Sequence, residues 1–293
     1  MASGLLLNAY LAIIARNLSP AEYGYFGAFW SLTLVAGFGF FLPIEQETAR
    51  LLQTPGRPLG VVRAVLATAA TMVVAQIAVL AISWPVLMRT FGGHSVTVVA
   101  FGVICLASGA QFIVRGALIG MDRMGRHALI MVVDAALRVA FATLVALVVA
   151  EPNSPEFAWT LAAALLLAHV PQLLALLPRR NRIGSLPAPG STNLTARDIG
   201  SAVVPLLLGS LCAQALLNGP PVLVPALAQT DADATRAGQF VAAYTLTRVP
   251  LFLVVPLQTA LLPLLTGLLH DGDRRALRRV IGKITAGLLT LAA

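Results

Sequence analysis

Charged residues are scarce in this sequence. They make up 11% of the 293 residues, whereas soluble domains carry about 25%. Hydrophobic residues make up 58% and the mean hydropathy is +0.86, so a soluble fold could not remove this much apolar surface from water. The scarcity of charge therefore excludes a soluble globular domain and predicts a polytopic integral membrane protein.

Lysine and cysteine are also rare, and the common catalytic motifs are absent. Lys283 is the one lysine among 20 cations. The arginines stand in short clusters between apolar runs rather than in a basic helix, which argues against nucleic acid as a partner. Cys105 and Cys212 lie inside apolar runs and suit buried small side chains. Because the sequence has no nucleophile elbow, P-loop or HExxH motif, we expect no enzyme activity, no metal and no cofactor.

Long apolar runs set the expected number of membrane spans. A helix needs about 20 residues to cross a hydrocarbon core of about 30 Å. The expected spans are 2–15, 24–44, 64–88, 95–114, 128–150, 157–177, 199–230 and 238–269. The first is short, and 284–293 begins a ninth span that stops after ten residues. We therefore predict an all-α polytopic membrane protein with eight complete or nearly complete spans and a partial ninth.

The cations alternate between successive loops. When the loops are assigned in turn to two sides, fifteen cations, Arg115 among them, fall on one side. The other side receives Arg16, Arg89 and Arg236, together with the acids Glu22, Glu151, Glu156, Asp231 and Asp233. Because loops rich in arginine and lysine stay in the cytoplasm, the fifteen mark the cytoplasmic side. The N-terminus is therefore expected inside, in a multi-pass protein.

An internal repeat relates two parts of the chain. With an offset of 214 residues, Gly24 aligns with Gly238, and eight of the 28 positions from Gly24 onward are identical. The preceding spans align at an offset of 210, which places Asn8 on Asn218. Six helices separate the repeats, so both halves have the same orientation and an axis along the membrane normal relates them. Chance similarity between apolar runs is the alternative.

A polar segment rich in proline, glycine, serine and arginine separates the repeats at 178–197. Such a composition is typical of a linker between domains. We therefore predict two pseudo-symmetric helical lobes. The N-terminal six-helix lobe, the cytoplasmic inter-lobe linker and the incomplete C-terminal lobe are expected at 1–178, 179–198 and 199–293.

The segment between the first two expected spans resembles a known family. Residues 15–24, Ala-Arg-Asn-Leu-Ser-Pro-Ala-Glu-Tyr-Gly, resemble the Ala-Arg-x-Leu-x-Pro-x-Glu-Tyr-Gly stretch of polysaccharide flippases. These are the Wzx-like members of the multidrug/oligosaccharidyl-lipid/polysaccharide flippase superfamily. Residues 218–244, with Asn218 and the run Gly238-x-Phe240-x-x-Ala243-Tyr244, resemble the counterpart in the second lobe. Because members have about twelve or more helices, the chain is expected to be a C-terminally truncated member.

The resemblance implies a function in polysaccharide biosynthesis. The protein would move a lipid-linked oligosaccharide or polysaccharide precursor across the bacterial plasma (inner) membrane, from the cytoplasmic leaflet outward. Its implied partners are the lipid-linked glycan, membrane lipid, and a glycan polymerase or glycosyltransferases of the same pathway. Two alternatives stay open: a MATE-like exporter of small molecules or drugs, and a non-transporting membrane component of glycan synthesis. The latter is an assembly partner, or a glycosyltransferase that uses Asp231 and Asp233 as a D-x-D pair.

Charged residues inside the expected spans are candidates for the substrate cavity, because each costs a few kcal/mol at membrane depth. Asp134 and Arg138 lie four residues apart on one helical face, a spacing that lets them pair. They are either a self-neutralising structural pair or a cavity wall in which Arg138 meets substrate phosphate. Arg248 lies ten residues into its span, and its guanidinium suits bidentate binding of phosphate. Its alternative is an ion pair with an acid on another helix, such as Asp134.

Uncharged polar residues complete the predicted substrate-binding set. Asn8, Gln214 and Asn218 lie within or near the spans. They either line the cavity or form hydrogen bonds between helices. Asn8 and Asn218 are favoured as cavity residues because they occupy matching positions of the repeat.

Overall fold

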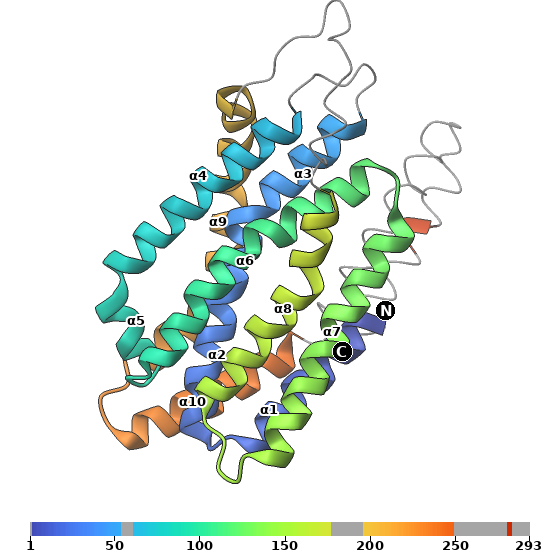
Figure 1. Cartoon of the computed structure of the whole chain (residues 1–293). Helices are drawn as coiled ribbons and strands as arrows, with labels where there is room; N and C mark the ends of the chain where they lie inside the picture. Colours follow the sequence, from blue (N-terminus) through green and yellow to red (C-terminus); the bar gives the residue numbers. More distant parts are fainter. Residues whose placement is uncertain (1, 54–60, 177–195, 249–279, 283–293) are drawn as a thin grey trace, which may run out of the picture.

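The computed structural model describes residues 2–53, 61–176, 196–248 and 280–282. Within these ranges the chain is helical and contains no strand (Figure 1). The elements are α1 (Ala2–Asn17), α2 (Pro20–Leu34), the π-helical turn η1 (Val35–Gly39), α3 (Phe40–Gln53), α4 (Val61–Ile82), α5 (Trp84–Thr90), α6 (Ser95–Gly120), α7 (Met124–Val148), α8 (Ser154–Leu176), α9 (Ala196–Ala226) and α10 (Asp231–Thr247).

Six helical segments are long and apolar enough to cross a membrane. They are Pro20–Gln53, Arg63–Ile82, Ser95–Gly120, Met124–Val148, Ser154–Leu176 and Arg197–Ala226. The first joins α2, η1 and α3 into one continuous segment. These segments confirm the predicted all-α membrane fold. The predicted spans 2–15 and 238–269 correspond to α1 and to the C-terminal part of α10, while 249–269, the ninth span and most of the linker lie outside the described residues.

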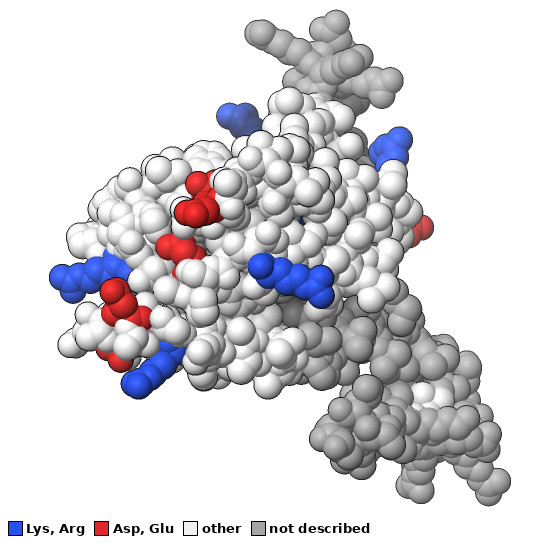
Figure 2. Space-filling model, turned by 90° about the horizontal axis from the view of Figure 1, so that it is seen from below, with Lys and Arg blue, Asp and Glu red and all other residues white. Residues whose placement is uncertain are grey.

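The connections between helices alternate between the two ends of the bundle. Those from α1 to α2, α5 to α6, α7 to α8 and α9 to α10 lie at the bottom of Figure 1, which we call the lower end. Helices α3, α6 and α8 finish at the opposite, upper end. Figure 2 views the molecule from below, where most of the visible surface is uncharged. The charges predicted for the less cationic side lie near the lower end; they are Arg16, Glu22, Arg89, Glu151, Glu156, Asp231, Asp233 and Arg236.

Aromatic residues form the core of the N-terminal part. Phe29 of α2 is fully buried, and its ring meets Phe91 and Phe101 in edge-to-face contacts with centroids 5.9 and 6.4 Å apart. On the outer faces of α7 and α9, large apolar side chains such as Leu147 and Leu216 are 80% exposed. An exposed apolar helix face is favourable against lipid, because the backbone polar groups are already bonded within the helix.

The second span is interrupted at the π-helical turn η1. Pro43 has no N–H to offer the carbonyl of Gly39, four residues earlier. The hydroxyl of Ser210 on α9 donates to that carbonyl instead, at 2.6 Å. One turn earlier, the side-chain amide of Gln76 on α4 donates to the carbonyl of Ala36 at 2.9 Å. The irregular backbone is therefore bound by polar side chains of two neighbouring helices.

Candidate functional site

Three of the predicted site residues join in one hydrogen-bonded chain. Arg248, at the end of α10, donates from Nη1 to Oδ1 of Asn218 on α9 at 3.0 Å. Asn218 donates from Nδ2 to Oε1 of Gln214 at 2.8 Å and to the Gln214 carbonyl at 3.0 Å. Because Asn218 is fully buried, this chain fixes the guanidinium of Arg248 to α9.

Tyr244 is a fourth member of this group, and it was not predicted. The guanidinium carbon of Arg248 lies 5.2 Å from the centre of the Tyr244 ring, and the Tyr244 hydroxyl donates to the Leu217 carbonyl at 2.8 Å. The four-residue spacing of Tyr244 and Arg248 along one helix was the available signal. In the described part of the chain Arg248 forms no ion pair, so the alternative of a pair with Asp134 is not seen. Its remaining donors can bind an anion.

Asp134 and Arg138 form a second group, on α7. Arg138 donates from Nε to Oδ1 of Asp134 at 3.2 Å and from Nη2 to Oδ2. Asp134 is 2% exposed. The guanidinium also lies over the ring of Trp30 on α2, 6.0 Å from its centre, and Trp30 contacts Tyr10 of α1. Asp134 and Arg138 therefore form the ion pair that their four-residue spacing allows, and both carboxylate oxygens of Asp134 are bonded.

Asn8 lies apart from both groups. Its side chain donates to the carbonyl of Gly4 at 2.9 Å, one turn earlier on α1. Asn218 makes the same type of bond to Gln214, the residue that the repeat aligns with Gly4. Within the described residues no hydrogen bond joins Asn8 to Arg248 or to Asp134.

A buried ion pair lies where the sequence predicted a loop. Arg115 was expected beyond the end of span 95–114, but α6 continues to Gly120 and Arg115 is 9% exposed. Its Nη2 donates to Oε1 of Glu45 on α3 at 3.3 Å, and its guanidinium lies over the rings of Phe112 and Phe38, 4.9 and 5.3 Å away. The predicted span ended before Arg115, because the local sequence gives no sign that Glu45, 70 residues away, neutralises this charge.

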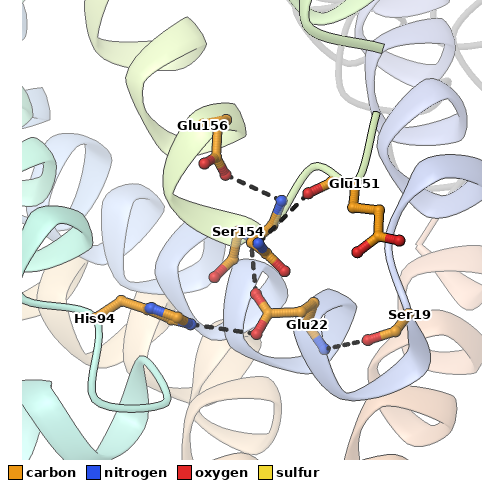
Figure 3. Close-up of polar contacts among 7 residues, drawn as sticks. Ser19, Glu22, His94, Glu151, Ser154 and Glu156 are labelled. Carbon is orange, nitrogen blue, oxygen red and sulfur yellow. Dashed lines mark hydrogen bonds and ion pairs between the residues drawn. The ribbon is translucent and has the colours of Figure 1, made fainter. Parts of the chain in front are cut away.

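Glu22, from the segment that carries the family resemblance, ties three elements together at the lower end (Figure 3). Its backbone N–H donates to the hydroxyl of Ser19, which caps α2. One carboxylate oxygen lies 3.2 Å from Nε2 of His94, and the other accepts from the backbone N–H of Ser154 at 2.8 Å. A negative charge is favourable at the start of α8 because of the helix dipole. Glu22 therefore joins α2, the α5–α6 connection and α8.

The neighbouring part of the same segment packs against α10. A Cβ atom on Gly24 would lie 3.1 Å from the Cα of Gly238, and one on Gly238 would overlap the Pro20 carbonyl. Three residues further along α2, a Cβ on Gly27 would overlap the side chain of Val241. Glycine is required where two helix backbones approach this closely. Helices α2 and α10 are therefore in backbone contact.

Asp231 and Asp233, the candidate D-x-D pair, begin α10. The Asp233 carboxylate accepts from the Thr230 hydroxyl at 2.7 Å and from the Thr230 backbone N–H at 3.2 Å, and the Asp233 N–H donates to that hydroxyl at 3.2 Å. This is a capping box. The hydrogen bond from Thr230 lowers the pKa of Asp233 below its ordinary value. The geometry of Asp233 is thus explained by a helix start.

Comparison with known proteins gives one match. Residues 2–269 match the model of a family described as polysaccharide biosynthesis protein. No curated protein and no solved structure gives a significant match. The match covers most of the chain and confirms the resemblance drawn from residues 15–24.

Proposed function

The chain belongs to the polysaccharide biosynthesis protein family, and from this membership we propose that it is a flippase. Membership places it in a membrane and in polysaccharide biosynthesis. The proposed substrate is a lipid-linked oligosaccharide or polysaccharide precursor, which passes from the cytoplasmic leaflet of the plasma membrane outward. The observation that carries this proposal is Arg248, which is held by Asn218 and has no acidic partner among the described residues.

Arg248 is the proposed anchor for the phosphate groups that join glycan to lipid. A guanidinium presents several donors in a rigid fork that matches phosphate oxygens. Gln214 and Asn218 hold that fork in one orientation, so little side-chain entropy is lost when substrate binds. Asp134, Arg138 and Asn8 are proposed to line the path in the N-terminal lobe.

The proposed architecture has two lobes, 1–178 and 199–293, joined by a cytoplasmic linker at 179–198. The backbone contact of α2 with α10 supports it, because this contact joins equivalent helices of the repeat. The proposed orientation places the N-terminus in the cytoplasm and the lower end outside. The distribution of cations between the two ends supports this orientation.

The proposed partners are the lipid-linked glycan, membrane lipid, and a glycan polymerase or glycosyltransferases of the same pathway. A glycosyltransferase activity of this chain is the less favoured candidate, since Asp233 serves α10 as a helix cap.

Reconstituted protein tests the proposal. Proteoliposomes that contain a fluorescent lipid-linked oligosaccharide are treated with a membrane-impermeant quencher. The protein should move labelled lipid from the inner to the outer leaflet, where the quencher removes its fluorescence. Loss of a charge-assisted hydrogen bond costs about 1.5–3 kcal/mol, so Arg248→Ala should slow this exposure by about tenfold or more. Arg236→Ala is the matched control, because Arg236 is exposed on the same helix. Equal rates for the wild-type protein and Arg248→Ala would remove Arg248 from the substrate site.

A further inference from the structure

An open hollow of about 300 Å³ lies between α9 and α10, near the lower end. Val224 and Leu227 of α9 line one side of it, and Phe240 of α10 lines the other. Ligand sites in proteins begin at about this volume, so the hollow has room for a group the size of one sugar ring. The proposed function gives this hollow no role.

The charged residues at the hollow do not make it an ion site. Among the described residues they are Asp233 and Arg236. The Asp233 carboxylate accepts from the hydroxyl and the backbone N–H of Thr230 in the cap of α10, and Arg236 is exposed to water. The rest of the lining is an aromatic ring and aliphatic side chains. A ligand that fits the hollow must therefore present apolar C–H surface to this lining.

Phe240 is the last of a row of side chains that begins at Arg248. The centres of the Phe240 and Tyr244 rings lie 5.7 Å apart, with their planes inclined by 30°. The Arg248 guanidinium lies 5.2 Å from the centre of the Tyr244 ring. Because these residues are spaced by four, they follow one face of the helix, and Phe240 lies about 12 Å from Arg248 along its axis. A ligand with a phosphate on Arg248 can thus reach Phe240 with the part that extends toward the lower end.

A sugar ring matches an aromatic ring in a way that a lipid chain does not. A pyranose presents polarised C–H groups on its faces and hydroxyl groups around its edge, so it can cover an aromatic face while its hydroxyls stay in contact with water. The negative face of an aromatic ring attracts such C–H groups. Phe240 is 38% exposed, which leaves part of its ring uncovered. An alkyl chain would pack equally well against an aliphatic side chain in the same place.

We propose that the hollow is a sugar-binding site in which Phe240 packs against the glycan while Arg248 binds the phosphate; this rests on the proposed flippase function. Arg248 contacts only the phosphate end, so by itself it would accept a lipid phosphate with or without a glycan. Phe240 adds affinity only when a sugar is attached. Phe240 is therefore the residue that distinguishes the loaded lipid from the bare one. Tyr244, whose hydroxyl is bonded to the Leu217 carbonyl of α9, is the positioning residue between the two.

The first test measures binding and does not depend on transport. Purified protein in detergent is titrated calorimetrically with geranyl diphosphate and with the same compound linked to glucose. The wild-type protein should bind the glucose-linked probe about three- to tenfold more tightly, the gain expected of one aromatic contact. Phe240→Leu, which keeps an apolar side chain, should bind both probes equally, and Phe240→Trp should restore the preference. Arg248→Ala should weaken both probes by the same factor.

Leu246→Ala is the matched control, because Leu246 is 70% exposed on another side of α10 and should leave the preference unchanged. The sugar site is refuted if the wild-type protein binds both probes equally or if Phe240→Leu keeps the preference. Equal weakening of both probes by Phe240→Leu would also refute it, since the hollow would then hold the geranyl chain.

The second test uses the flipping of labelled lipid-linked oligosaccharide in proteoliposomes, with unlabelled bare lipid diphosphate as a competitor. The competitor should inhibit Phe240→Leu at a several-fold lower concentration than it inhibits the wild-type protein. Equal inhibition of the two proteins would overturn the role of Phe240 in selecting the loaded lipid. A wild-type protein that prefers the glucose-linked probe but flips no lipid would refute the flippase function and leave the sugar site in place. Flipping without any preference for the sugar would do the reverse.

Discussion

Gly24 and Gly238, which the proposed repeat aligns with each other, touch where α2 meets α10. In an assembly with two-fold symmetry, a residue meets its own equivalent only at the symmetry axis. Gly27 and Val241, related by the same offset of 214, also meet. The pseudo-two-fold axis of the proposed two-lobe architecture, placed through this contact, would account for both pairs. The two helices are then closed against each other at the lower end.

Gly238→Ala should open this contact. The added Cβ would overlap the Pro20 carbonyl, and overpacking of this kind costs typically 1–3 kcal/mol. In a protein whose exposed Cys212 has been replaced, a cysteine introduced at the buried Ala234 reports the opening. It should react several-fold faster with an impermeant maleimide when Gly238→Ala is present.

Gly209→Ala is the control for this experiment, because nothing lies within 4 Å of the Cβ it would add. If both alanine variants leave the reactivity of the cysteine unchanged, α2 and α10 are not held together by the glycine contact.

Glu22→Ala should destabilise the lower end. It removes the charge that caps α8 and the partner of His94. The loss of a capping side chain costs about 1 kcal/mol, which lowers a thermal unfolding midpoint by roughly 2–4 °C in a chain of this size. Glu151→Ala is the comparison, since Glu151 is exposed at the same end. Equal midpoints for the two variants would assign Glu22 no structural role.

Asn218→Ala should impair transport through Arg248. Without the Asn218 oxygen the guanidinium loses its hydrogen bond to α9, so substrate binding must order it and KM for the lipid-linked glycan should rise. Because Gln214 belongs to the same chain, the effects of Gln214→Ala and Asn218→Ala should be non-additive in a double-mutant cycle. Asn8→Ala and Asn218→Ala, at separate sites, should combine additively. Additive effects in both cycles would show that the hydrogen-bonded chain does not act as a unit.

Ser210→Ala should destabilise the protein more when Pro43 is present than when it is replaced. The substitution leaves the Gly39 carbonyl without the Ser210 donor, at a cost of about 1–3 kcal/mol. In a Pro43→Ala background the helix supplies an N–H for that carbonyl, so the same substitution should cost less. The measurement is the unfolding midpoint of the four proteins of this cycle. The same loss in both backgrounds would mean that Ser210 does not replace the donor missing at Pro43.

Contacts within one helix were accessible from the sequence, and contacts between distant helices were not. The spacing of Asp134 and Arg138 was enough to predict that they can pair, and the repeat directed attention to Asn218. Arg115 was assigned to a loop, because hydropathy alone ends a span at a charge. Its neutralisation by Glu45 depends on the packing of α3 against α6, which close contacts at Gly116 allow. No pattern along the chain contains that contact.

The position of Glu22 in the chain also determines when its contact with α8 can form during synthesis of the protein. Glu22 leaves the ribosome 132 residues before Ser154, whose N–H its carboxylate accepts. Until α8 has entered the membrane, that carboxylate has only water and His94 as partners at the lower end. The bond between α2 and α8 can therefore form only after Ser154 has been synthesised. A nascent chain released before Ser154 would lack the bond that fixes α2 to α8.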